Sequence, residues 1–302
     1  MKELVVISGK GGTGKTSLVA SFAALSREAV VADCDVDAAD LHLVLSPTVL
    51  RRESFSGGAV ARIKPGHCTA CAKCQELCRF DAIFLDGPGN GRIAKTFRVD
   101  PIACEGCGVC VHFCAEGAVE FVSADSGKWF VSETRVGPMV HARLGVAQEN
   151  SGKLVSLIRE QARALAVEHG RGLILVDGSP GIGCPVIASI TGADMALVVA
   201  EPTLSGLHDL TRVAELAGHF GIPAAVCVNK WDLNAELADR VESEAARDGL
   251  AVVGRVRYDR AVTDAQIRGL SVVEHSHDGL AEDVRKLWTE TAALLARSKG
   301  KG

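Results

Sequence analysis

The stretch Gly9-Lys10-Gly11-Gly12-Thr13-Gly14-Lys15-Thr16 follows the pattern G-x-x-x-x-G-K-T of a phosphate-binding loop. The apolar residues 4–7 precede it and predict a buried strand, and residues 17–25 follow it and predict a helix. Glycines in such a loop let backbone N–H groups turn toward an anionic phosphate, and the helix N-terminus adds its dipole. A glycine-rich turn that binds nothing is the alternative, but it does not require the flanking strand and helix. The sequence therefore predicts a nucleotide phosphate site here.

The loop supplies most of the residues that we expect to bind the nucleotide. Lys15 would reach the β- and γ-phosphates, and the Thr16 hydroxyl would bind Mg²⁺. The expected binding residues of this segment are Gly9, Lys10, Gly11, Gly12, Thr13, Gly14, Lys15, Thr16 and Ser17.

Lys10 is a second lysine inside the loop, and an ordinary phosphate-binding loop does not need it. The text GKGGTGKT resembles the deviant Walker A motif of the MinD/ParA class of ATPases, which includes the nitrogenase iron protein and the Mrp-type iron–sulfur carriers. In that family the extra lysine contacts nucleotide phosphate across a face-to-face dimer. The resemblance implies that Lys10 is this signature lysine, that it acts in catalysis with Lys15, and that the working form is a homodimer with Mg-ATP bound.

Two further acidic segments directly follow apolar runs that predict strands. Ligands of open α/β sheets bind at the carboxyl ends of the strands, which is where these acidic residues would lie. By the same resemblance, Asp35 lies near the γ-phosphate and the attacking water, as a catalytic residue, while Asp33 lies close to Mg²⁺. Asp177 ends the apolar residues 172–176 and resembles the Walker B aspartate, which holds Mg²⁺ through water. The amide of Gly181 would then sense the γ-phosphate. An acidic helix N-terminus is the alternative for the first segment.

Asn229, Lys230 and Asp232 form the pattern N-K-x-D at the end of another apolar run. In GTPases this aspartate reads guanine, whereas in the MinD class the asparagine usually meets the adenine amino group. The pattern alone leaves ATP and GTP open, and Lys10 favours ATP. All three residues are expected to bind the nucleotide.

Eight of the eleven cysteines occur in two runs of the pattern C-x₂-C-x₂-C-x₃-C. This repeat is typical of a bacterial ferredoxin with two [4Fe–4S] clusters, in which the fourth cysteine of each run ligates the other cluster. A zinc ribbon fits poorly, because zinc sites space their cysteines in pairs. Arg79 and Ala115 stand where ferredoxins usually have proline, which removes no ligand. The expected ligands are Cys68, Cys71, Cys74 and Cys114 for one cluster, and Cys104, Cys107, Cys110 and Cys78 for the other.

The alternation of strand and helix patterns predicts an α/β fold with a doubly wound, mostly parallel sheet. The cysteine runs interrupt it as an inserted α+β domain of the bacterial ferredoxin type. We expect the first part of the P-loop ATPase domain at residues 1–59, the inserted 2[4Fe–4S] ferredoxin domain at 60–122, and the second part of the ATPase domain at 123–302.

Three cysteines lie outside the runs. Cys34 and Cys227 fall in or beside apolar runs and are expected to be structural. Cys184 begins a predicted helix, where a thiol tends toward the thiolate, so it is a possible extra ligand for a transferred cluster or metal. A merely buried cysteine is the interpretation that we favour for it.

Composition narrows the function classes. The 302 residues carry a net charge of −4, which gives no electrostatic case for nucleic-acid binding. No apolar run is long enough to span a membrane, and the basic residues 297–302 have no apolar face, so we expect a cytoplasmic protein without a membrane partner. Three hypotheses remain. The first is an ATPase that drives electron transfer through the clusters to an unidentified redox or metallocluster protein. The second is a carrier or scaffold for cluster assembly, and the third is a positioning ATPase like MinD or ParA.

Overall fold

The computed structural model describes residues 1–124, 126–145 and 151–298. Within them the chain forms two compact units. The sheet unit comprises Met1–Glu53, Trp129–Arg143 and the chain from Ser151 onward, and the cysteine unit comprises Ser54–Lys128 with a short piece that starts at Leu144. The predicted segment 60–122 falls within the bounds of the cysteine unit, and its assignment as a ferredoxin stays a prediction.

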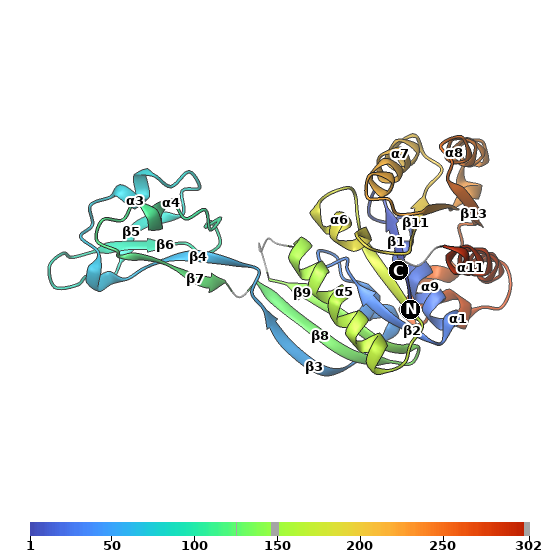
Figure 1. Ribbon diagram of the computed structural model, residues 1–302, viewed down its shortest axis with the longest axis horizontal. Coiled ribbons are helices and arrows are strands. Elements are labelled where there is room, and N and C mark those ends of the chain that lie inside the picture. Colours follow the sequence, from blue (N-terminus) through green and yellow to red (C-terminus); the bar gives the residue numbers. More distant parts are fainter. Residues whose placement is uncertain (125, 146–150, 299–302) are drawn as a thin grey trace. The chain divides into compact units, whose positions relative to one another are not determined.

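The sheet unit is built on nine strands in the order β13-β12-β11-β1-β10-β2-β9-β8-β3 (Figure 1). From β13 to β9 every neighbouring pair is parallel, which confirms the predicted mostly parallel α/β sheet. The central strands are buried on both faces, as expected for continuous apolar runs. The bounds are β1 (Lys2–Ser8), β2 (Ala29–Asp33), β3 (Thr48–Phe55), β8 (Gly127–Thr134), β9 (Gly137–Leu144), β10 (Leu173–Pro180), β11 (Met195–Ala200), β12 (Ala224–Asn229) and β13 (Ala251–Val256).

Helices cover this sheet. The helices α1 and α11 share one buried cluster with the strands, in which the Phe22 and Trp288 rings lie 5.0 Å apart. The helices α5 and α6 pack on each other and on β10. The bounds are α1 (Lys15–Ser26), α2 (Leu41–Leu45), α5 (Ser151–Glu168), α6 (Cys184–Ile190), α7 (Leu204–His219), α8 (Ala235–Arg247), α9 (Ala261–Ile267), α10 (Val272–His275) and α11 (Leu280–Arg297).

The strand β3 was not expected from the sequence, because nearly all of its side chains are exposed. Arg51 lies 4.7 Å from the centroid of the Trp129 ring, and Arg52 lies 5.4 Å from that of Phe130. Both aromatic residues belong to β8, so cation–π contacts between side chains join these two strands.

The cysteine unit has a much smaller core. Its strands form two antiparallel pairs, β4 (Gly58–Ile63) with β7 (Val119–Ala124) and β5 (Ile83–Gly87) with β6 (Thr96–Val99). Two one-turn helices, α3 (Lys73–Glu76) and α4 (Val109–His112), lie within the cysteine runs. The buried cluster consists of Ala61, Ile63, Cys68, Ile83, Phe97, Ala118 and Val119, and half-buried cysteines pack against it. Sulfur atoms thus take positions that apolar side chains fill elsewhere.

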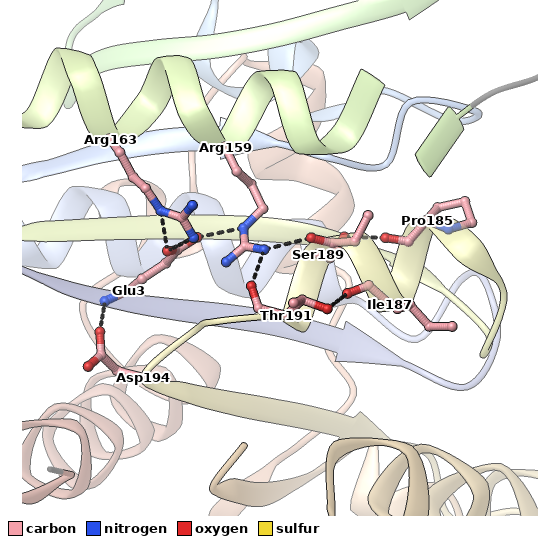
Figure 2. A network of polar contacts seen from close by, with 9 residues as sticks. Glu3, Arg159, Arg163, Pro185, Ile187, Ser189, Thr191 and Asp194 are labelled. Carbon is pink, nitrogen blue, oxygen red and sulfur yellow. Dashed lines mark hydrogen bonds and ion pairs between the residues drawn. The ribbon is translucent and has the colours of Figure 1, made fainter. Parts of the chain in front are cut away.

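A buried ionic network fixes β1, the strand that leads into the glycine loop (Figure 2). Glu3 accepts hydrogen bonds from Arg159 at 2.6 Å and from Arg163 at 2.7 Å, both on α5. The Arg159 guanidinium, only 3% exposed, also donates to the carbonyl oxygens of Ala188 and Thr191 at the end of α6. One side chain thereby ties three elements together.

Candidate functional site

A cavity of about 650 Å³ lies where the parallel strands end. This volume is within the range of small-molecule sites. Of the residues expected to bind the nucleotide or to act on it, those that line the cavity are Gly11, Gly12, Thr13, Gly14, Lys15, Thr16, Ser17, Asp35, Asn229 and Lys230.

The glycine loop needs its glycines for conformation and for space. Gly12 and Gly14 have φ angles of 79° and 87°, in the left-handed region that glycine adopts without strain. A Cβ atom on Gly14 would lie 2.4 Å from Nδ2 of Asn229. That amide donates a 2.7 Å hydrogen bond to the carbonyl oxygen of Thr13, so the end of β12 supports the loop.

Lys15 is buried at the centre of the site. Its Nζ lies 3.1 Å from Oδ2 of Asp35 and 2.8 Å from Oδ1 of Asp177. Burial alone would lower the pKa of Lys15, but attraction to the two carboxylates outweighs it and raises the pKa above its ordinary value. The ammonium therefore stays charged, and an incoming phosphate would compete with the carboxylates for it.

Two carboxylates beside this lysine have unsatisfied oxygens. Among the described residues, Oδ2 of Asp33 and Oδ2 of Asp177 are buried without a hydrogen-bond partner. Burial, together with repulsion from Asp177, raises the pKa of Asp33 well above its ordinary value. Burial also raises the pKa of Asp35, against the opposing attraction of Lys15. Buried oxygens of this kind suit a hard divalent cation, so Asp33, Asp177 and the hydroxyl of Thr16 fit Mg²⁺.

Lys10 does not line the cavity; Glu201, which follows β11, holds it. Nζ of Lys10 lies 2.9 Å from one oxygen of Glu201, and Nζ of Lys230 lies 2.6 Å from the other. Lys230 also donates to the carbonyl oxygen of Gly12 at 2.9 Å. Burial opposes ionisation of Glu201, but the hydrogen bonds from the two lysines outweigh it and lower its pKa. The role of Lys10 across a dimer stays a prediction.

Three other residues that were expected to bind the nucleotide also lie away from the cavity lining. Gly9 is packed so closely that a Cβ atom would lie 2.2 Å from Cβ of Asp209. The Gly181 amide, expected at the γ-phosphate, donates to the carbonyl oxygen of Ser8 at 2.8 Å. Asp232 accepts a 2.7 Å hydrogen bond from the backbone amide of Tyr258.

A further part of the cavity lining was missed from the sequence. It is formed by Arg257, Tyr258 and Asp259, directly after β13, and by Gln266 of α9. The sequence did contain a signal for these residues, namely the apolar run of β13. Residues that follow the carboxyl end of a parallel strand face the ligand, so residues 257–259 could have been expected at the cavity.

The first predicted cysteine set surrounds a second cavity. Cys68, Cys71, Cys74 and Cys114 line a space of about 160 Å³. Backbone amides donate to two of the sulfur atoms: Ala70 to Cys68 at 3.4 Å and Ala118 to Cys114 at 3.3 Å. Burial raises the pKa of the Cys74 thiol to about 11, so the thiol would need a cationic partner to ionise at neutral pH.

The second predicted set shares this chemistry. Cys104 accepts from the Ala61 amide at 3.5 Å, and Cys78 accepts from the Ala82 amide at 3.4 Å. Burial raises the pKa of Cys110, while Cys107 is exposed.

In the described part of the chain, no group of three or more His, Cys, Asp or Glu side chains is set to hold a single metal ion. A cubane cluster makes a different demand, because its ligands bind separate irons and surround a space instead of converging on a point. The four cysteines around the second cavity fit that demand.

Among the cysteines outside the runs, Cys34 and Cys227 are buried, whereas Cys184 is exposed at the start of α6. The expectation of a buried Cys184 is therefore wrong. Its Cβ lies 3.4 Å from the position that a Cβ on Gly152 would take, so its neighbour is the first turn of α5.

Within the described ranges, no helix is long and apolar enough to cross a membrane. The expectation that the basic tail has no apolar face concerns residues 297–302. Of these, Arg297 and Ser298 are described, whereas residues 299–302 lie outside the described ranges.

The family model described as "CobQ/CobB/MinD/ParA nucleotide binding domain" matches residues 4–272. The Methanocaldococcus jannaschii protein MJ0578 is 34% identical over 236 residues, which cover 77% of this chain and 79% of that protein.

Solved structures share the fold. The cell division ATPase MinD of Pyrococcus furiosus matches with a TM-score of 0.57 at 16% identity, over 97% of this chain and 99% of that one. The septum site-determining protein MinD of Pyrococcus horikoshii, complexed with Mg-ADP, matches with a TM-score of 0.56 at 14% identity, over 98% and 99%.

Proposed function

The chain belongs to the family of CobQ/CobB/MinD/ParA nucleotide-binding domains and is a P-loop ATPase, and from this premise we propose that it couples Mg-ATP-driven switching of a homodimer to electron transfer through two [4Fe–4S] clusters. The sheet unit would bind and hydrolyse the nucleotide, and the cysteine unit would hold the clusters. When bound, the clusters would supply one-electron transfer to a protein redox or metallocluster partner in the cytoplasm.

The observation that carries the proposal is the cysteine-lined cavity. Three of its cysteines come from the first run, and the fourth, Cys114, comes from the second. This crossing of runs is the ligand pattern of two-cluster ferredoxins. The amide-to-sulfur hydrogen bonds to Cys68, Cys78, Cys104 and Cys114 add support, because such bonds stabilise the thiolate charge and tune cluster potentials.

The connection between the two units supports coupling. Asp35 is followed by α2, whose Leu43 and Val44 line the nucleotide cavity, and then by β3, which runs directly into the cysteine unit. After β8, Arg135 donates to the carbonyl oxygen of Val44 at 3.0 Å. The strand β3 and the residue that follows β8 are thus both connected to α2, which lines the nucleotide cavity. Contacts with a γ-phosphate that order such a segment are a common basis for switching.

The test is spectroscopic and anaerobic. After reconstitution with iron and sulfide, we expect about eight irons per chain, because two cubanes hold four each. The dithionite-reduced protein should give an EPR signal whose shape or potential differs between ADP and a non-hydrolysable ATP analogue. In Cys114→Ser the iron content should fall, and Cys184→Ser is the matched control that should retain it. Lack of any [4Fe–4S] signal in the wild type would refute the proposal.

A cluster-assembly carrier is a second candidate, favoured by the exposed thiol of Cys184 in the sheet unit. Such a carrier would pass its cluster to an apo-acceptor protein in an ATP-dependent way. Clusters that respond to ATP but stay bound when an apo-ferredoxin is added would favour electron transfer over this candidate.

A positioning ATPase is a third candidate, favoured by the fold shared with MinD proteins. That function requires ATP-dependent dimerisation but not the clusters. If a Cys114→Ser variant in living cells keeps the wild-type distribution and phenotype, positioning becomes the better description.

A further inference from the structure

Asp232 ends the N-K-x-D pattern, yet its contacts differ from those of a base-reading aspartate. Asn229 and Lys230 line the nucleotide cavity, whereas Asp232 does not. One of its carboxylate oxygens, Oδ1, accepts the backbone amide of Tyr258 at 2.7 Å. Tyr258 does line the cavity, as part of the wall 256–259.

We propose that Asp232 is a positioning residue, which holds the wall 256–259 of the nucleotide cavity through Tyr258 and does not read the base itself. The inference rests on the proposed function for the binding of Mg-ATP, and it adds a residue that shapes the binding site.

The local backbone explains how the aspartate reaches the wall. Lys230 has a φ angle of 59°, and the 3₁₀ turn Trp231–Leu233 follows it directly. This left-handed step ends β12 abruptly and turns the chain toward the neighbouring strand β13. Asp232 then meets the amide of Tyr258, two residues beyond the end of β13.

The wall is fixed by acidic residues on further elements as well. Arg257 donates three hydrogen bonds to Asp283 of α11, two from its guanidinium at 2.6 and 2.8 Å and one from its backbone amide at 3.3 Å. Arg255 binds Glu242 of α8 and lies 5.6 Å from the centroid of the Trp231 ring. With Asp232, these contacts fix Arg255, Arg257 and the backbone of Tyr258, whose side chain is 52% exposed.

The chemistry of the two bases shows what an aspartate that reads the base would need. Guanine presents an N1–H and a 2-amino group, and a carboxylate recognises both by accepting with its two oxygens. Asp232 has one oxygen engaged by a backbone amide and lies off the cavity lining. Adenine has no hydrogen on N1 and so needs no carboxylate there.

The experiment compares ATP, GTP and xanthosine triphosphate as substrates of the full-length wild type, Asp232→Ala and Asp232→Asn. The wild type should prefer ATP in kcat/KM. Asp232→Ala should raise the KM for ATP about tenfold, the size of one lost hydrogen bond, while kcat changes less than about twofold. Asp232→Asn keeps an oxygen that accepts the Tyr258 amide, so it should restore the KM without changing the order of the nucleotides. Glu236→Gln, a neighbouring surface substitution on α8, is the matched control.

Two results would overturn the inference. One is an Asp232→Asn enzyme whose kcat/KM rises for xanthosine triphosphate and falls for GTP. That change in substrate preference is the one expected when an aspartate that reads the base is replaced by asparagine. The other is a KM for ATP that Asp232→Ala leaves unchanged. If Asp232→Ala fails to fold, the order of kcat/KM for the three nucleotides in Asp232→Asn provides the test instead. A wild type that binds no ATP would instead refute the proposed function.

Discussion

The two units of this chain offer their candidate sites on two different kinds of core. In the sheet unit, apolar strands such as β1 and β11 are buried on both faces, and the charged groups of the nucleotide site lie at their ends. In the cysteine unit, the buried cluster is small and the cysteines are part of it. In the sheet unit the hydrophobic core lies beside the nucleotide site, whereas in the cysteine unit the cysteines of the candidate site make up much of the core.

Under the proposed function, this difference predicts which unit would depend on its cofactor for stability. Small domains bury a smaller share of their surface on folding, and many of those with a small core add metals or disulfides. For such domains the free energy of metal binding becomes free energy of folding. The sheet unit needs no such contribution, because its hydrophobic cluster joins the strands to α1 and α11 without the nucleotide.

Iron removal should have the largest effect. Chelation of the reduced protein should unfold the cysteine unit and leave the sheet unit folded. Hydrogen exchange measured by mass spectrometry should show loss of protection within residues 54–128 and retained protection in β1 and β11. Nucleotide binding, followed by calorimetry, should persist. Equal loss of protection in both units would show that the comparison is wrong.

Lys15→Ala should have the next largest effect, confined to the other unit. Loss of the lysine that lies between Asp35 and Asp177 removes the charge that would stabilise the transferred phosphoryl group. We expect kcat for ATP to fall at least about 100-fold. Iron content after reconstitution should equal that of the wild type, and a fall in iron content would contradict the separation of the two sites.

Arg159→Met should destabilise the sheet unit by about 3–5 kcal/mol, because it leaves the buried carboxylate of Glu3 with a single partner. The matched substitution is Arg163→Met, which removes a partner that is 41% exposed and should cost about 1 kcal/mol or less. Urea denaturation followed by far-UV circular dichroism measures both. Similar losses in the two variants would show that burial does not set the energy of this network (Figure 2).

Arg62→Met should have the smallest effect. The pair of Arg62 with Glu120 joins β4 to β7, but both side chains are accessible to solvent. We expect no measurable change in the denaturation midpoint of the iron-loaded protein. A clear fall would mean that surface charge, in addition to the cluster, stabilises the cysteine unit.

The parallel sheet could be predicted because its strands are continuous apolar runs, as in residues 4–7 and 195–199. The glycine loop could be predicted because its spacing follows from phosphate geometry. By contrast, β3 could not, since an exposed strand with two adjacent arginines carries no apolar alternation and depends on aromatic residues of β8.

The contacts of single polar side chains were also beyond prediction. Glu201 joins Lys10 and Lys230, which lie 220 residues apart, and no motif surrounds it. Asp232 matched a motif, but its contact is with a backbone amide that only the fold brings near. Patterns identify residue types that suit a chemistry, whereas the partner of each residue depends on tertiary structure.

The neighbouring positions of β3 and β8 in the sheet have a consequence for how such a protein can arise. The chain leaves the sheet from β3 and returns to it on β8, so the segment with both cysteine runs is topologically a loop between two neighbouring strands. Loops are the places where a chain accepts an additional domain without changing the order of its other strands. A nucleotide-binding ancestor could therefore have acquired the cysteine unit in one genetic step, with its sheet and its phosphate loop already in working order.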